Sequence, residues 1–146
     1  MPPLIRNWLV NILKGLRPLS FSLPMTLSRN LRLTLAVLYF LFISFLFVLP
    51  GSAFPKDDWL HKIWFDKWVH IGLFAGLALA WSWALGLDHK RNLYVVFGVL
   101  AIYGMVVEGV QHFFVANRSY DIGDWIADLV GSVLGLWFWY RRYIKK

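Results

Sequence analysis

The chain has 146 residues, of which 59% are hydrophobic, and it contains nine Trp and twelve Phe. Its mean hydropathy of +0.57 is well above that of an ordinary soluble domain, so the composition indicates an integral membrane protein. The chain has no Cys, which excludes disulfides, thiolate metal sites and cysteine nucleophiles. The net charge of +7 is explained by membrane topology and by attraction to an anionic leaflet, so we do not expect a nucleic-acid partner.

The first 30 residues form a basic, amphipathic segment. Its apolar residues, from Leu4 to Leu16, recur at helical spacing, while Arg6, Lys14 and Arg17 lie on the opposite face. This pattern predicts a short helix on the cytoplasmic membrane surface. The alternative is a disordered basic tail whose pattern is accidental. The segment is too long and too amphipathic for the basic part of a signal peptide.

Four apolar runs follow, and each approaches the roughly 20 residues that a helix needs to cross a bilayer core of about 30 Å. They predict an all-α membrane domain, residues 31–146, whose helices cover residues 33–49, 68–87, 93–115 and 125–140. The first run ends at Pro50 and Gly51, which do not readily continue a helix. The fourth is shorter and carries Asp128, so a buried helix of a soluble protein is its alternative. Its Trp- and Tyr-rich end and basic tail favour a membrane interface.

The distribution of Lys and Arg predicts the orientation of this domain. Eleven of them flank the runs on the side of the two termini, and four lie in the loops 50–67 and 116–124 or at their edges. Because basic residues accumulate on the cytoplasmic side, both termini are expected in the cytoplasm. The two loops then lie on the extracytoplasmic side.

Polar side chains gather at the predicted outer ends of the last three helices. Glu108 lies about 10 Å before the end of its helix, and Asp128 lies about 6 Å beyond Asp124 along the next. Ionisable groups at membrane depth are costly, so they indicate a functional site. Their neighbours extend the set, which comprises Asp66, Lys67, His70, Glu108, Gln111, Arg118, Asp121, Asp124 and Asp128.

Several members of this set have simpler interpretations. Asp66 and Asp121 are candidate helix N-caps, Asp124 is a candidate first-turn acid, and Lys67 has the position of an interfacial residue that extends toward water. A buried ion pair of Glu108 and Asp128 with Arg118, which only locks the helices, is the structural alternative.

Other polar and small residues in these runs are assigned no chemical role. His61 and His112 lie off the inward stripe and are interpreted as interfacial residues. Two pairs of glycines spaced four apart predict close helix packing, namely Gly72 with Gly76 and Gly131 with Gly135.

Four short motifs resemble, in order, those of the VanZ-like family of small bacterial membrane proteins. They are DKWVH from Asp66, EGVQ from Glu108, RSYDIGD from Arg118 and GSVLG from Gly131, and the resemblance covers roughly residues 35–140. It implies a four-helix domain in the bacterial cytoplasmic membrane and, for the founding member, an association with resistance to teicoplanin. Asp128 departs from the pattern, because family members usually carry Asn at this position.

The first functional hypothesis is an outward-facing site that binds or acts on an amphiphilic envelope ligand, such as a lipid head group, a lipid-linked precursor or a lipoglycopeptide. His70 is the expected general acid or base, because imidazole titrates nearest neutral pH, and Glu108 and Asp128 complete the catalytic set. Arg118, with Lys67, is expected to hold a phosphate or carboxylate, and the remaining ligand-binding residues are Asp66, Gln111, Asp121 and Asp124.

Two other classes of function stay open. One is a non-catalytic module that binds an antibiotic or a partner membrane protein, and the other is a small transporter, which four helices could build only as a homo-oligomer. A divalent metal is compatible with one His among several carboxylates, although no known metal-binding motif is present. Membrane lipids are the expected surroundings in every case.

Overall fold

The structure is a computed structural model that describes residues 27–50, 64–116, 118 and 120–145. Every secondary-structure element in these residues is helical, and four helices are long and apolar enough to cross a membrane, which confirms the predicted all-α fold. The predicted N-terminal surface helix lies outside the described residues. The elements are α2 (Arg29–Phe47), α4 (Phe65–Leu85), α5 (Lys90–Phe114), α6 (Ile122–Trp139) and η2 (Tyr140–Ile144), a π-helical continuation of α6.

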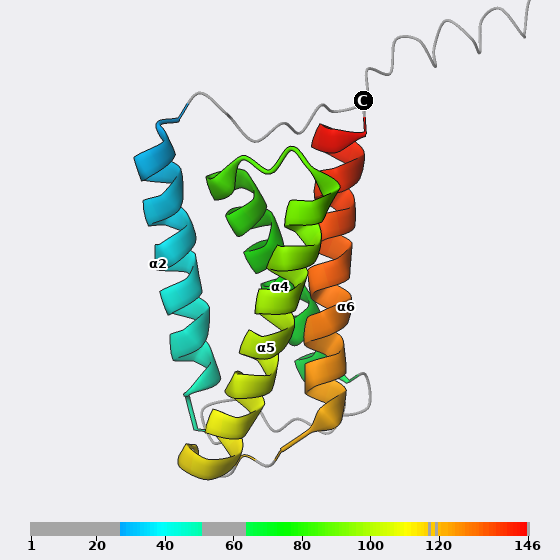
Figure 1. The fold of residues 1–146 in the computed structure, drawn as a ribbon. Helices are drawn as coiled ribbons and strands as arrows, with labels where there is room; N and C mark the ends of the chain where they lie inside the picture. Colours follow the sequence, from blue (N-terminus) through cyan, green and yellow to red (C-terminus); the bar gives the residue numbers. More distant parts are fainter. Residues whose placement is uncertain (1–26, 51–63, 117, 119, 146) are drawn as a thin grey trace, which may run out of the picture.

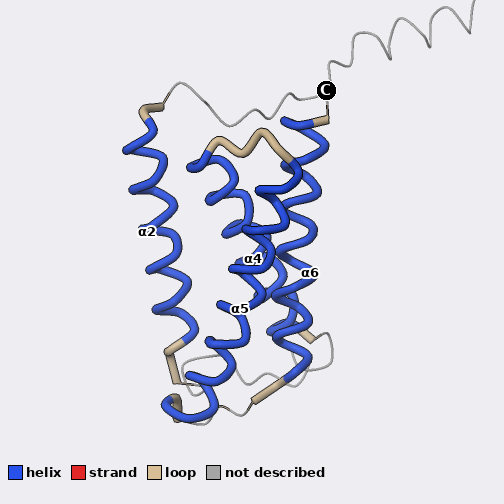
Figure 2. The backbone as a smooth tube through the Cα atoms, viewed as in Figure 1, coloured by secondary structure: helices blue, strands red, loops and turns tan. Residues whose placement is uncertain are grey.

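Successive helices run in opposite directions along the bundle (Figure 1). The carboxyl ends of α2 and α5 therefore lie at the same end as the amino ends of α4 and α6, and the C-terminus lies at the opposite end. The backbone trace in Figure 2 shows the same arrangement of the four helices. We call the end that contains Phe47, Phe65, Phe114 and Ile122 the polar end.

Each helix begins three or four residues before the predicted apolar run, because its first turn is polar or is capped by a polar side chain. The Ser28 hydroxyl accepts a hydrogen bond from the backbone N–H of Leu31 at 3.3 Å and starts α2. The Asp121 carboxylate accepts one from the backbone N–H of Gly123 at 2.7 Å and starts α6. Such caps satisfy amide groups that lack a partner within the helix, and hydropathy does not detect them.

The most extensive packing in the bundle is between α4 and α6. A side chain at Gly131 would collide with the backbone carbonyl of Ile71, and one at Gly135 would collide with that of Ala75. These two glycines therefore allow close helix approach, as predicted. Gly76 instead accommodates the Tyr39 ring. The prediction for Gly72 was wrong, because this residue is exposed and no described atom lies near the position of its Cβ.

Polar side chains also connect neighbouring helices through backbone carbonyls. Arg32 on α2 donates a hydrogen bond to the carbonyl of Trp83 at 2.7 Å, and the Tyr39 hydroxyl donates one to Leu73 at 3.2 Å. The Trp139 indole donates one to the carbonyl of Leu87 at 2.9 Å, just after α4. In a medium without water, such bonds replace the solvation that these groups would otherwise lose.

We expect the substitution Gly131→Ala to destabilise the bundle by roughly 1–3 kcal/mol, because the added methyl group has to displace the backbone of α4. Thermal unfolding of the purified protein in detergent measures the effect. Gly72→Ala is the matched control on the facing helix, and its effect should stay within about 0.5 kcal/mol. Equal effects of the two substitutions would contradict the close contact between α4 and α6.

Candidate functional site

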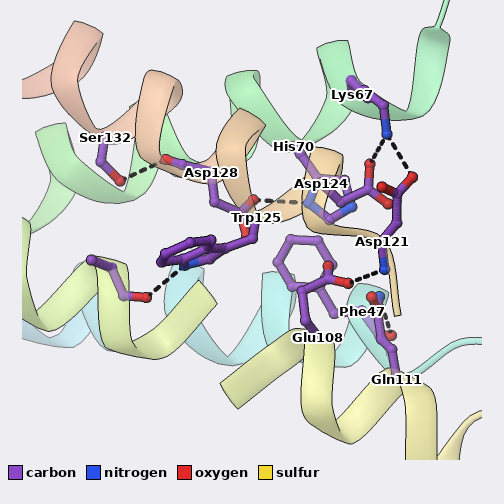
Figure 3. Close-up of polar contacts among 11 residues, drawn as sticks. Phe47, Lys67, His70, Glu108, Gln111, Asp121, Asp124, Trp125, Asp128 and Ser132 are labelled. Atoms are coloured by element: carbon purple, nitrogen blue, oxygen red, sulfur yellow. Dashed lines mark hydrogen bonds and ion pairs between the residues drawn. The ribbon is translucent and has the colours of Figure 1, made fainter. Parts of the chain in front are cut away.

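All nine predicted site residues lie at or near the polar end, and Figure 3 shows how most of them converge. The structure buries His70 on α4, Glu108 and Gln111 on α5, and Asp124 and Asp128 on α6. Lys67 and Asp121 are partly buried, and Asp66 is exposed. Arg118 lies between α5 and α6 with its side chain partly buried.

His70 and Asp128 form a buried pair between α4 and α6. The His70 Nδ1 and Asp128 Oδ1 atoms lie 2.8 Å apart, and the two side chains are 4% and 0% exposed. The Phe47 ring of α2 packs on the imidazole with its centroid at 4.9 Å. The backbone carbonyl of Asp128 accepts a hydrogen bond from the Ser132 hydroxyl at 2.8 Å. The contacts with the Asp128 carboxylate and the Phe47 ring hold the imidazole in one orientation.

Glu108 lies beside this pair and is completely buried. Its Oε2 accepts a hydrogen bond from the backbone N–H of Asp121 at 3.1 Å, which connects α5 to the start of α6. Two carboxylate oxygens, Glu108 Oε1 and Asp128 Oδ2, are buried and have no hydrogen-bond partner among the described residues. We call His70, Glu108 and Asp128 the inner centre.

Lys67 connects α4 to the first turn of α6. Its Nζ lies 2.8 Å from Asp121 Oδ2 and 2.7 Å from Asp124 Oδ1, and we call these three residues the outer clamp. Asp121 is the N-cap of α6 and Asp124 lies in its first turn, as predicted. The N-cap prediction for Asp66 was wrong, because α4 begins at Phe65 and Asp66 already lies in its first turn.

The clamp changes the acidity of Asp121, which lies just outside the membrane-spanning helix. The hydrogen bond from the Lys67 ammonium lowers the pKa of the Asp121 carboxyl below its usual 3.8, and the Gly123 N–H acts in the same direction. Partial burial opposes this effect. Asp121 therefore stays charged at neutral pH and keeps its ion pair with Lys67.

The charges of the polar end are unevenly distributed. Among the described residues, the carboxylates of this end are those of Asp66, Glu108, Asp121, Asp124 and Asp128, and the basic groups are those of Lys67, His70, His112 and Arg118. The Lys67 ammonium is already bound by two of the carboxylates. The inner centre, which is one turn deeper, therefore has only imidazole within it to balance two carboxylates.

Two residues of the polar end were not predicted from the sequence. Phe47 contacts the His70 ring and, through its carbonyl, accepts a hydrogen bond from Gln111 Nε2 at 3.0 Å. Trp125 donates from its indole to the carbonyl of Ala101 at 3.1 Å and connects α6 to α5. Both are apolar or aromatic residues within apolar runs, so neither hydropathy nor spacing distinguished them from lipid-facing neighbours.

An apolar crevice of about 130 Å³ lies between α2 and α5 beside the inner centre. Most of its walls are apolar, from residues such as Phe47 and Val107, and Ser44, Tyr103 and Gln111 add polar side chains. Phe47 thus faces the crevice and also touches the His70 ring. Phe47 and Gln111 therefore line the apolar space at the place where it comes nearest to the inner centre.

Comparison of the chain with protein families, with curated proteins and with solved structures found no match. The resemblance to VanZ-like proteins therefore stays a prediction. The function has to be inferred from the chemistry of the polar end itself.

We expect the stability contributed by Asp121 to depend on pH. Because its pKa is lowered in the folded protein, this contribution is present above the usual value of 3.8 and is lost as the pH falls through the folded-state pKa. Asp121→Asn should therefore lower the melting temperature at pH 6, and the difference from the wild type should shrink toward pH 3. A difference that is constant across this range would contradict a charged clamp.

Proposed function

We propose that the protein binds the head group of an amphiphilic cell-envelope molecule at the polar end, and that the inner centre contacts or acts on this head group. One observation carries the proposal. Three ionisable side chains with almost no exposed surface, His70, Glu108 and Asp128, meet at one end of a membrane-spanning bundle, next to an apolar crevice.

A purely structural role explains this arrangement poorly. Removing a carboxylate from water costs several kcal/mol even after the protein has relaxed around it, and apolar residues of similar size often stabilise such a position better. The inner centre contains two carboxylates, and each retains an oxygen that no described group binds. An ion pair that only held the helices together would not need these two oxygens. A ligand site would use both of them to bind the ligand.

The crevice supports an amphiphilic ligand. A head group that interacts with Gln111 would lie at the polar end of the bundle, while part of an acyl or polyprenyl chain could follow the apolar walls between α2 and α5. Ligands of this kind reach the site from the bilayer, so the position of the crevice on the side of the bundle is consistent with their approach.

In the catalytic form of the proposal, the imidazole of His70 exchanges a proton with the head group while Asp128 fixes its tautomer. Glu108 is a second proton carrier on the opposite helix. Arg118 would contact an anionic part of the ligand, and the outer clamp would hold the mouth of the site together. In the non-catalytic form, the same groups recognise an antibiotic, a lipid or a partner membrane protein.

The resemblance to VanZ-like proteins extends the proposal to location and phenotype. With the basic residues of both termini in the cytoplasm, the polar end faces the outside of a bacterial cytoplasmic membrane. Lipid-linked precursors and lipoglycopeptides are the envelope molecules that this surface would meet, and reduced susceptibility to teicoplanin is the matching phenotype. A transporter is disfavoured, because residues 93–107 offer no ionisable side chain other than Tyr94 and Tyr103.

We expect single substitutions His70→Gln, Glu108→Gln and Asp128→Asn to abolish ligand-dependent function while the protein still inserts. In the catalytic form, turnover should fall about 10²–10⁴-fold with ligand retention unchanged, because a proton carrier is lost. Native mass spectrometry of the purified protein measures co-purified amphiphiles, and growth on teicoplanin measures the phenotype.

Loss of the retained amphiphile, instead, would favour the non-catalytic form. Asp88→Asn is the matched control, because Asp88 is an exposed acid at the opposite end of the bundle. If all three inner-centre variants behaved like this control, the proposed site would be wrong. Asp128→Asn also restores the usual residue of the resembling family, so it measures what the additional acid contributes.

The orientation can be tested with single cysteines, because the chain has none of its own. We expect Tyr120→Cys, at an exposed position of the polar end, to react with a membrane-impermeant maleimide on intact cells. Asp88→Cys, at the opposite end, should react only after permeabilisation. The reverse pattern would place the polar end in the cytoplasm.

A further inference from the structure

The inner centre has the composition and spacing of a metal-ion site. One imidazole nitrogen of His70 and one carboxylate oxygen each from Glu108 and Asp128 lie within 4.8 Å of one another. When a metal ion binds nitrogen and oxygen ligands at about 2.0–2.2 Å, the ligand atoms lie roughly 3–4 Å from one another. Small movements of the three side chains would bring their ligand atoms to these distances. Figure 3 shows that the three side chains come from α4, α5 and α6 and converge on one interior region.

The unbound oxygens of this centre point to a cation. Glu108 Oε1 and Asp128 Oδ2 are buried, and no group in the described part of the chain donates a hydrogen bond to either. A buried acceptor without a donor costs about 1–3 kcal/mol, and a charged one costs more. A divalent ion would bind both oxygens and would balance the two negative charges.

The acids of the outer clamp, together with the neighbouring Asp66, are a useful comparison. Asp66, Asp121 and Asp124 also bring carboxylate oxygens within 4.8 Å of one another. Their counter-charge is already present, however, because the Lys67 ammonium binds Asp121 and Asp124. Asp66 is exposed and can be solvated by water. The outer acids therefore need no metal. The inner acids differ, because Lys67 does not bind them and they are not exposed to water.

We propose that His70, Glu108 and Asp128 bind one divalent metal ion of the Zn²⁺ or Mn²⁺ type. A mixed set of one nitrogen and two oxygen ligands suits these borderline ions better than Ca²⁺, which prefers six to eight oxygen ligands. His70 Nδ1 and Asp128 Oδ1 lie at a hydrogen-bond distance of 2.8 Å, so the side chains have to move apart slightly for the imidazole and the free Oδ2 of Asp128 to bind the ion together. Three protein ligands leave coordination positions for an outside group.

The proposed metal site does not depend on the proposed function. The role of the ion, however, rests on the proposed function. When bound, a divalent ion supplies the positive charge that an acidic site lacks and polarises a phosphoryl or carbonyl oxygen. An anionic head group could then bind beside two carboxylates. The inner centre would act through the ion, and His70 would be a ligand instead of a free base.

The test uses the full-length protein, purified in detergent and treated with EDTA. Metal content is measured by inductively coupled plasma mass spectrometry after re-loading with Zn²⁺ or Mn²⁺, and affinity is measured by titration calorimetry. We expect one ion per chain and a raised melting temperature. Glu108→Gln and Asp128→Asn should each weaken binding by at least about tenfold, because each removes a charged ligand.

Asp88→Asn is the control, because it removes an exposed acid at the opposite end of the bundle and should leave the affinity for the ion within about threefold. Circular dichroism and size-exclusion chromatography establish that each variant is folded. The proposal is overturned if the wild type binds neither ion saturably, or if the inner variants bind as tightly as the control. If the protein binds the metal but retains no amphiphile, the metal site is supported and the proposed function is contradicted.

Discussion

The cost of keeping Glu108 and Asp128 out of water determines much of what surrounds them. Neither side chain has exposed surface, and a charged group in an apolar bundle is stable only with a hydrogen-bond donor or a cation beside it. The imidazole of His70 satisfies one oxygen of Asp128, and the backbone N–H of Asp121 satisfies one oxygen of Glu108. Because these partners come from α4 and from the start of α6, the polar groups can be satisfied only when three helices are correctly aligned.

The packing of the bundle provides that alignment. Gly131 and Gly135 bring α6 against the backbone of α4, so the His70–Asp128 pair is set by contacts that tolerate little movement. α2 contacts mainly α4, and its contact with α5 is much smaller. The bundle thus combines a closely packed pair that fixes the inner centre with a looser side on which Phe47 covers the imidazole. The helix pair that holds His70 and Asp128 is thus packed more tightly than the helix that carries Phe47.

The sequence predicted the four spans, and it singled out polar residues that the structure gathers at one end of the bundle, because both depend on signals that are local along the chain. A run of apolar residues and a carboxyl at membrane depth can each be recognised without a partner. Helix starts were placed too late, since Ser28 and Asp121 act as caps through hydrogen bonds that composition does not record. Which glycine meets a neighbouring helix depends on rotation about the helix axis, and so Gly72 was misassigned. Phe47 was missed because its role depends on its contact with His70, and the sequence does not show that contact.

The two acids at the start of α6 also bear on how the protein enters the membrane. A translocating helix that carries an unpaired Asp near the bilayer centre is disfavoured by about 3 kcal/mol, and less toward the helix end. Asp124 and Asp128 find their partners on Lys67 and His70, which belong to a helix synthesised 50 to 60 residues earlier. If α4 stays beside the insertion machinery until α6 emerges, the two helices can enter the bilayer as a pair, which avoids the cost of an unpaired Asp. The ion pairs of the mature site would in this way act first as an assembly signal.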